Sequence, residues 1–184
     1  MRDIASGALS ATQVLMPGEQ GYPRGLSIQK PSPILYTRGN SALLTHHLIG
    51  LFCSIRCPGG AILRAIDWVK TVPTTGVAVI SGFHSPIEQE CLALLLRRGI
   101  PVVVCPAREI ACYRYPKSWE DAVLSGRLLM LSPFANKHAT VVLANKRNAL
   151  VAALADALVV VHAPEGSRTH AVVESAGNKP ITKL

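Results

Sequence analysis

Short aliphatic runs alternate along the chain with longer amphipathic stretches, and this alternation restricts the possible folds more than any other feature. The runs are almost continuous in Val, Ile and Leu, as strands buried on both faces of a sheet should be. Strand–helix alternation of this kind predicts a parallel sheet with right-handed crossovers. The predicted strands are Ile34–Thr37, Leu48–Ser54, Val77–Ser81, Pro101–Cys105, Leu128–Leu131 and Ala157–His162, with a short last one at Pro180–Thr182.

Four helices are predicted between and after these strands. In the stretch 86–98, Pro86 suits a first helical turn and Gly99 suits a C-terminal stop. The other predicted helices are Gly60–Lys70, Thr140–Leu154 and Ser167–Ala176. We therefore predict one α/β domain over residues 34–184, a Rossmann-like three-layer parallel sheet with helices on both faces.

Residues 1–33 lack any hydrophobic period and are rich in Gly, Pro, Ser and Gln, so we predict a lead-in segment there. The chain has 184 residues, of which 49% are hydrophobic and 16% charged, which is enough for a folded core. No apolar run reaches the roughly 18 residues that a membrane span needs. No secretory signal is recognisable at the N-terminus. We expect a cytoplasmic protein without a membrane partner.

The cysteines do not predict a metal site. Of the five cysteines, which include Cys112, Cys91 and Cys105 lie among apolar residues, as buried thiols do. Cys53 and Cys57 are separated by three residues, but no second Cys/His pair has zinc-ligand spacing. We predict no metal and no cofactor.

The positive charge is unevenly distributed. The formal net charge is +8, and no acidic residue lies between Asp121 and Asp156. A basic stretch of this kind favours a polyanionic partner. It contains Arg127, Lys137, His138, Lys146 and Arg147.

Loops beyond the carboxyl ends of parallel strands are where ligands of such sheets bind. In the first of these loops, Ser54 and Arg56 precede Gly59-Gly60 and a predicted helix start. Backbone N–H groups at a helix start favour an anion, and an arginine adds a charge-assisted contact. A plain strand-to-helix turn is the alternative.

The second loop reads Ser81-Gly82-Phe83-His84-Ser85. His84 is a candidate donor to a ligand, and Phe83 is a candidate for stacking on a nucleic-acid base. The alternatives are that Ser85 caps the next helix with His84 exposed, and that Phe83 belongs to the core.

The third group joins Lys146, Arg147 and Asn148 to Gly166 and Ser167 after the last long strand. Two basic residues beside an asparagine suit phosphate, and the later loop can present amides and a hydroxyl to an anion. The alternatives are solvated helix charges and a simple N-cap at Ser167.

Enzyme signatures are not recognisable. The chain has no G-x-G-x-x-G, no Walker loop and no G-x-S-x-G elbow. Glu88 and Glu90 are two residues apart and point to different helix faces. We predict no catalytic residue, and a nucleotide hydrolase using His84 and Glu88 stays open as a third function.

Motifs at the start of the predicted domain resemble those of a known family. Tyr22-Pro23-x-x-Leu26 and Pro31-x-Pro33-x-Leu35-Tyr36-x-x-Gly39-Asn40 are similar to the beginning of the Rossmann domain in the DNA-processing protein A (DprA, or Smf) family. Four loop motifs resemble that family too, and the resemblance spans about residues 22–178. They are Ser54-Ile55-Arg56, Ser81-Gly82, Arg147-Asn148 and Gly166-Ser167-x-Thr169.

The chain also departs from the family pattern. After Ser81-Gly82 the family usually continues with Ala-x-Gly-Ile-Asp, whereas this chain has Phe83-His84-Ser85-Pro86-Ile87. We expect neither an N-terminal helical domain nor a C-terminal winged helix, and therefore a minimal single-domain member. The related "lonely guy" enzymes carry Pro-Gly-Gly-x-Gly-Thr, of which only Pro58-Gly59-Gly60 is present, so phosphoribohydrolase activity is not expected.

The resemblance implies a single-stranded DNA-binding protein of DNA processing, uptake and transformation, a homodimer, with a recombinase as a further partner. The alternative function is a module that binds or carries a nucleotide or a phosphorylated cofactor. Either ligand would meet the same predicted residues. They are Ser54, Arg56, Ser81, Gly82, Phe83, His84, Lys146, Arg147, Asn148, Gly166, Ser167 and Thr169.

Overall fold

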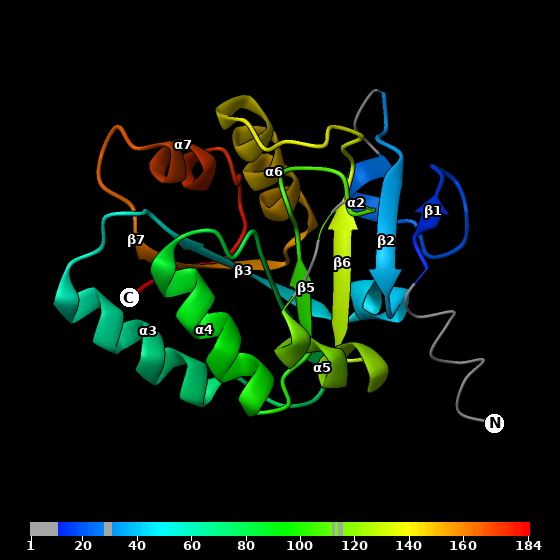
Figure 1. Cartoon of the computed structure of the whole chain (residues 1–184). Coiled ribbons are helices and arrows are strands. Elements are labelled where there is room, and N and C mark those ends of the chain that lie inside the picture. Colours follow the sequence, from blue (N-terminus) through cyan, green and yellow to red (C-terminus); the bar gives the residue numbers. More distant parts are fainter. Residues whose placement is uncertain (1–10, 28–30, 112, 114–115) are drawn as a thin grey trace.

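A computed structural model describes residues 11–27, 31–111, 113 and 116–184, which form one eight-stranded sheet (Figure 1). The strand order is β1-β2-β6-β5-β4-β3-β7-β8. The strands are β1 (Gln13–Leu15), β2 (Leu35–Gly39), β3 (His47–Cys53), β4 (Val77–Ser81), β5 (Val102–Val104), β6 (Leu128–Ser132), β7 (Ala157–His162) and β8 (Ile181–Lys183).

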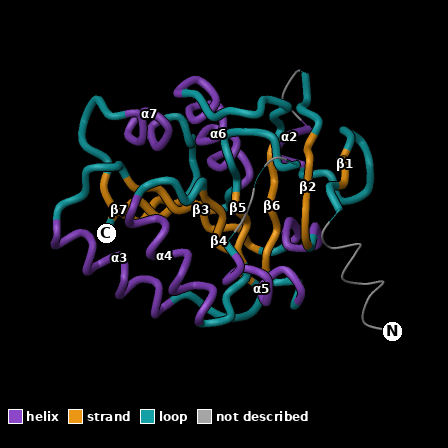
Figure 2. Tube along the Cα trace, viewed as in Figure 1, coloured by secondary structure: helices purple, strands orange, loops and turns teal. Residues whose placement is uncertain are grey.

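Helices cover both faces of the sheet and complete the three layers (Figure 2). One face carries α3 (Gly59–Thr71), α4 (Pro86–Arg97) and α5 (Glu120–Leu124). The other carries α2 (Arg24–Ser27), α6 (Val141–Leu154) and α7 (Arg168–Glu174), with the 3₁₀ turn η1 (Ser41–Thr45). A second 3₁₀ turn, η2 (Lys117–Trp119), precedes α5. Within the described residues, no helix is long and apolar enough to cross a membrane.

Two apolar cores lie between these layers, because successive strand residues point to opposite faces of the sheet. In β3, Leu51 packs toward α3 and α4, whereas its neighbour Phe52 packs toward α6. The same division separates Val79 from Ile80 in β4. This double burial explains why the strands are continuous aliphatic runs rather than alternating ones.

The predicted Rossmann-like fold is confirmed, with one difference at a sheet edge. Strands β3 to β8 pair in parallel, as expected. Strand β2, however, pairs antiparallel with β6, and β1 pairs antiparallel with β2. Only residues 40–46 separate β2 from β3, too few for the helical crossover that consecutive parallel strands require.

The described part of the lead-in segment takes part in the packing. Tyr22 and Leu26 are buried in the α6-side core, and the Tyr22 hydroxyl donates to the Pro33 carbonyl at 2.7 Å. Residues 1–10 and 28–30 of the predicted segment lie outside the described residues, as does Cys112.

The helices around the carboxyl edge of the sheet begin at side-chain caps. Ser85 and Glu88 form a capping box at the start of α4, with the Ser85 hydroxyl accepting from the Glu88 amide. Thr140 accepts from the Leu143 amide at the start of α6, and Ser167 accepts from the His170 amide at the start of α7. These helix N-termini lie just beyond the carboxyl ends of the strands that precede them.

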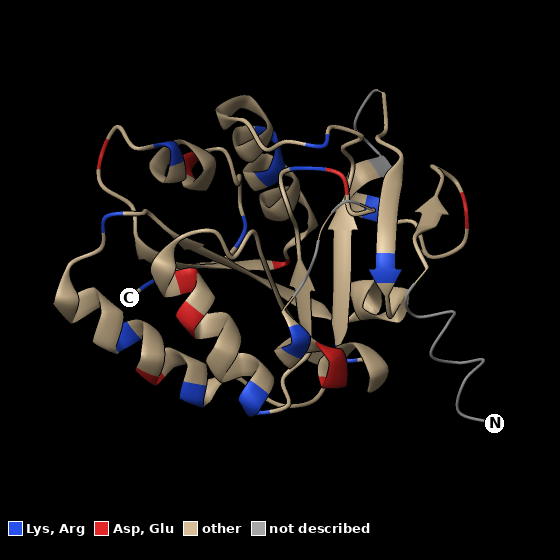
Figure 3. Ribbon diagram, viewed as in Figure 1, with Lys and Arg blue, Asp and Glu red and all other residues tan. Residues whose placement is uncertain are grey.

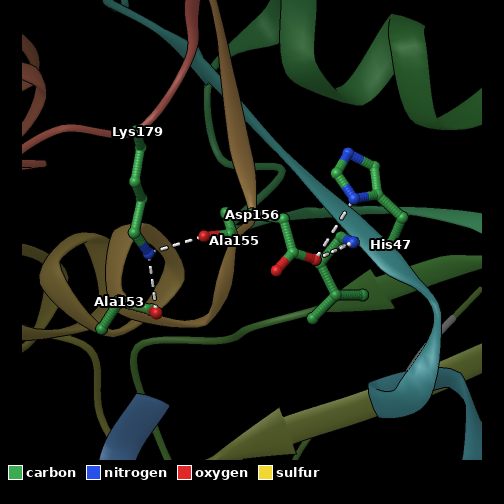
Figure 4. Close-up of polar contacts among 6 residues, drawn as sticks. His47, Ala153, Ala155, Asp156 and Lys179 are labelled. Carbon is green, nitrogen blue, oxygen red and sulfur yellow. Dashed lines mark hydrogen bonds and ion pairs between the residues drawn. The ribbon is translucent and has the colours of Figure 1, made fainter.

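The opposite, amino edge of the sheet gathers the carboxyl ends of α3, α4 and α6. The Lys179 ammonium donates to three carbonyls at the end of α6, those of Ala152, Ala153 and Ala155, at 2.7, 2.9 and 2.6 Å. Asp156 accepts from the Leu48 amide at 2.7 Å and faces His47 at 3.6 Å (Figure 4). Cations beside helix carboxyl ends compensate the partial negative charge there.

Candidate functional site

A cleft of about 950 Å³ lies at the carboxyl edge of the sheet. It is lined by the loops that follow β3, β4, β5 and β7 and by the first two turns of α6. The chain moves from β3 through β4 to β5 in one direction, and β7 then lies on the other side of β3. The gap between β3 and β7 is thus a topological switch point, where ligands of open α/β sheets bind.

Arg147 and Gly82 form the most tightly packed part of the cleft. The Arg147 side chain is 5% exposed and donates to the Cys105 carbonyl at 3.1 Å and to Asn148 Oδ1 at 2.7 Å. A Cβ atom on Gly82 would lie 1.6 Å from Arg147 Nη1. Glycine is therefore required here because the guanidinium occupies the space of a side chain. Burial lowers the pKa of Arg147, and the nearby Glu88 carboxylate opposes this shift.

The first loop presents a cation and an aliphatic side chain to the cleft, whereas its serine hydroxyl is buried. The Ser54 amide donates to the His162 carbonyl at 2.8 Å, which holds this loop against β7. Ser54 Oγ is buried without a hydrogen-bond partner among the described residues. Arg56 is exposed, and Ile55 is 61% exposed. The predicted Gly59-Gly60 turn is instead the first turn of α3 and does not line the cleft.

The second loop is folded inward at Phe83. This residue has a φ of +44° and is 5% exposed within the α3–α4 core. Phe83 therefore belongs to the core, and its ring is not a free stacking surface. Ser81 is buried beneath the loop, where its hydroxyl accepts from the Phe83 amide at 3.2 Å. His84 is exposed at the cleft.

Glu88 joins the first and second loops. Its Oε1 accepts from the Cys53 amide at 2.9 Å, and its Oε2 accepts from the His84 and Ser85 amides at 2.8 and 3.1 Å. The carboxylate is 7% exposed. Because its oxygens already hold three amides, Glu88 serves as a structural acceptor rather than as the base of a His84–Glu88 hydrolase.

The third group is only partly assembled at the cleft. Gly166 adopts a φ of +71°, which favours glycine, and Ser167 caps α7. Thr169 is buried at the cleft wall, and Asn148 lines it next to Arg147. Lys146, in contrast, is exposed on α6 and does not line the cleft, because a helix turns by about 100° per residue and Arg147 faces the sheet.

Sequence reasoning missed two arginines and a tyrosine that line the cleft: Arg108, Arg168 and Tyr113. Arg168 is the first residue of α7 and stands next to the predicted Ser167, so its position after a strand was a usable signal. Arg108 and Tyr113 lie in the long connection after β5. That connection has no glycine-rich turn of the kind that marked the other loops.

The charge of the cleft is strongly positive. Its described lining contains Arg56, Arg108, Arg147 and Arg168, against one carboxylate, Glu88. Elsewhere Lys and Arg are spread over the molecule, including the ends of α3 and α4 far from the cleft (Figure 3). Arg127 of the basic stretch bonds Ser125 and the Leu96 carbonyl near the amino edge. The basic stretch between Asp121 and Asp156 as a whole thus does not form the site. The loops that follow the strands form it.

The fold and cleft define a Rossmann-like α/β protein with an arginine-lined cleft at its switch point. A family model described as DNA recombination-mediator protein A matches residues 13–181, and the chain belongs to this family. The predicted resemblance is thereby confirmed. A search of curated proteins finds no match.

Two solved structures share the fold at low sequence identity. DNA processing protein A from Streptococcus pneumoniae is 18% identical with a TM-score of 0.80, covering 97% of this chain and 64% of that one. DNA processing protein A from Helicobacter pylori, described for its unique single-stranded DNA binding mode, is 18% identical with a TM-score of 0.73, covering 96% and 82%. This chain therefore spans less than two thirds of the S. pneumoniae protein.

Proposed function

We propose that the chain binds single-stranded DNA in this cleft as part of DNA processing. The observation that carries the proposal is the convergence of four arginines on one cleft whose only carboxylate among the described residues is occupied by backbone amides. Two long helices, α4 and α6, also begin at the cleft and add partial positive charge. Membership of the DNA recombination-mediator family and the H. pylori relative support the same ligand.

The spread of the arginines favours a strand over a single nucleotide. Arg108 follows β5 and Arg168 follows β7, and these strands are three positions apart in the sheet. With about 4.8 Å between neighbouring strands, the separation is about 14 Å. A nucleic-acid strand advances about 3.4 Å per stacked nucleotide, so the cleft spans roughly four nucleotides.

The side chains divide into contacts and supports. Arg56 and Arg168 are exposed and would contact phosphates. Gly166 would add a backbone contact, and His84, which is exposed at the cleft, would add a side-chain contact. Arg147 is buried and would act mainly by holding the Gly82 loop in place.

Salt dependence tests the proposal directly. Fluorescence anisotropy would follow binding of a labelled oligothymidylate of about 16 nucleotides. The two exposed arginines predict a slope of about −1.4 in log affinity against log salt, or about a sevenfold loss between about 50 and 200 mM salt. No binding at the lower salt concentration would refute the proposal. Tight, salt-independent binding of a mononucleotide would support the small-ligand alternative instead.

Family membership also leads us to propose a homodimer that passes its DNA to a recombinase. Light scattering of the free protein tests the first proposal. Co-purification with a recombinase, with and without single-stranded DNA, tests the second. A location in the cytoplasm stays a prediction.

A further inference from the structure

The connection after β5 carries a stack of three side chains at one end of the cleft. The Arg108 guanidinium carbon lies 4.8 Å from the centre of the Tyr113 ring. The Tyr113 ring in turn stacks on Trp119, with ring centres 6.4 Å apart and an angle of 22° between the planes. Arg108 and Tyr113 line the cleft, whereas Trp119 is outside its lining. The stack therefore reaches the cleft through its arginine and tyrosine members.

The backbone beneath this stack is held at three successive residues. The Ser132 hydroxyl donates to the Arg108 carbonyl at 2.8 Å. The Glu109 amide donates to the Asn136 carbonyl at 2.8 Å, and the Arg38 guanidinium donates to the Ile110 carbonyl at 3.1 Å. Ile110 is fully buried. The loop thus presents Arg108 to the cleft from a fixed base.

The stack differs from the phosphate-directed arginines in how its cation is held. Arg108 is half-buried, and its guanidinium lies on the Tyr113 ring. Arg56 and Arg168 are exposed on the loops of β3 and β7, at the other end of the cleft. A planar cation held on an aromatic ring suits a flat apolar partner better than a hydrated phosphate.

We propose that Arg108, supported by Tyr113 and Trp119, is a stacking platform for a nucleobase of the bound strand. The proposal rests on the proposed binding of single-stranded DNA and names the part of the ligand that this end of the cleft takes. Arginine planes and aromatic rings stack on any base, so this contact would be tolerant of sequence. The platform would provide the base stacking that the sequence suggested for Phe83, whose ring is buried in the core.

An abasic strand separates base contacts from phosphate contacts, because it keeps the phosphates and lacks the bases. Affinities would be measured for an oligothymidylate and an abasic strand of equal length. The native protein should bind the thymidylate about tenfold more tightly. Arg108→Lys keeps the charge but loses the planar group, so it should remove most of this preference; Tyr113→Leu should do the same. The matched control Arg56→Lys should keep the preference.

The outcomes distinguish this proposal from the one on which it rests. Equal binding of both strands by the native protein, or an unchanged preference in Arg108→Lys, would overturn the platform and make Arg108 a phosphate contact. Failure to bind either strand would instead refute DNA binding as a whole. Thermal unfolding of Tyr113→Leu checks that its loss of preference does not come from a loss of fold, and Arg108→Lys tests the platform without altering the ring stack.

Discussion

The two edges of the sheet use the same kinds of charged side chain in opposite ways. At the amino edge, Lys179 and Arg98 are bound by helix carbonyls: Lys179 bonds three at the end of α6, and Arg98 bonds those of Val69 and Val72 at the end of α3. At the carboxyl edge, Arg56 and Arg168 are exposed at the mouth of a cleft. Whether a lysine or arginine indicates a ligand site can therefore be judged only once its hydrogen-bond partners within the protein are known.

Helix direction explains this difference. Every crossover helix of a parallel sheet starts near the carboxyl edge and ends near the amino edge, so free carbonyls collect at one edge and free amides at the other. Cations at the amino edge find partners within the chain. At the carboxyl edge, side-chain oxygens of Ser85, Thr140 and Ser167 cap some of the amides, and the remaining positive potential is directed into the cleft.

Arg147→Ala should have the largest effect, since this residue belongs to both the fold and the cleft. The change removes the donor to the Cys105 carbonyl and the cation near the buried Glu88 carboxylate. We expect a loss of about 3 kcal/mol in the free energy of unfolding, measured by urea denaturation, together with weaker DNA binding. An unchanged stability would show that the Arg147–Gly82 packing is not needed for folding.

Lys179→Met should affect the fold alone. It keeps the aliphatic stem and leaves the three carbonyls of Ala152, Ala153 and Ala155 without their cation. We expect about 1–2 kcal/mol less stability and unchanged affinity for single-stranded DNA. A fall in DNA affinity without a loss of stability would contradict the proposed division of roles between the two edges of the sheet.

Arg56→Ala and Arg168→Ala should show the reverse pattern. Both side chains are exposed, so the unfolding midpoint should hardly move. DNA affinity at low salt should fall about tenfold in each variant, and the salt slope should decrease by about 0.7. Arg97→Ala is the matched control, since Arg97 is exposed in the last turn of α4. Arg98 is unsuitable as a control because it caps α3. Equal losses in Arg97→Ala and Arg56→Ala would contradict the cleft.

The smallest predicted effect concerns pH. Burial raises the pKa of Cys91 and of Cys105 to about 12, from an ordinary value of 9.0. Thiols with a raised pKa in the folded state contribute stability that is complete below pH 9 and is lost as the pH rises toward 12. Between pH of about 8 and about 9.5, we expect a loss of under about 1 kcal/mol per thiol. The double variant Cys91→Ala, Cys105→Ala should lose correspondingly less over the same interval.

Much of the fold could be predicted from the sequence because buried parallel strands and capped helices leave strong local patterns. The strands β3 to β7 and the long helices α3, α4 and α6 agree with their predicted ranges to within a few residues. The strand β1 and the direction of β2 could not be predicted. The direction of β2 depends on its pairing with β6, which is distant in sequence, and β1 forms by pairing with β2.

The candidate site was predictable at the level of loops and less so at the level of side chains. The order of parallel strands brings the loops of Ser54, Gly82 and Gly166 to one edge whatever their exact residues. Helix rotation decides whether a side chain such as Lys146 reaches the cleft, and the backbone turn decides whether a ring such as that of Phe83 is exposed there. Single residues reveal neither. Arg108 reaches the cleft because hydrogen bonds hold the connection after β5 in place, and the sequence does not reveal these bonds.

The three amides held by Glu88 have a consequence for the speed and cost of binding. A single carboxylate clamps the end of β3, the second loop and the start of α4, so these parts form one mechanical unit. A ligand entering the cleft then has little loop entropy to remove, which favours association in a single fast phase without a slow closing step. This part of the cleft is thus already formed before the DNA strand binds.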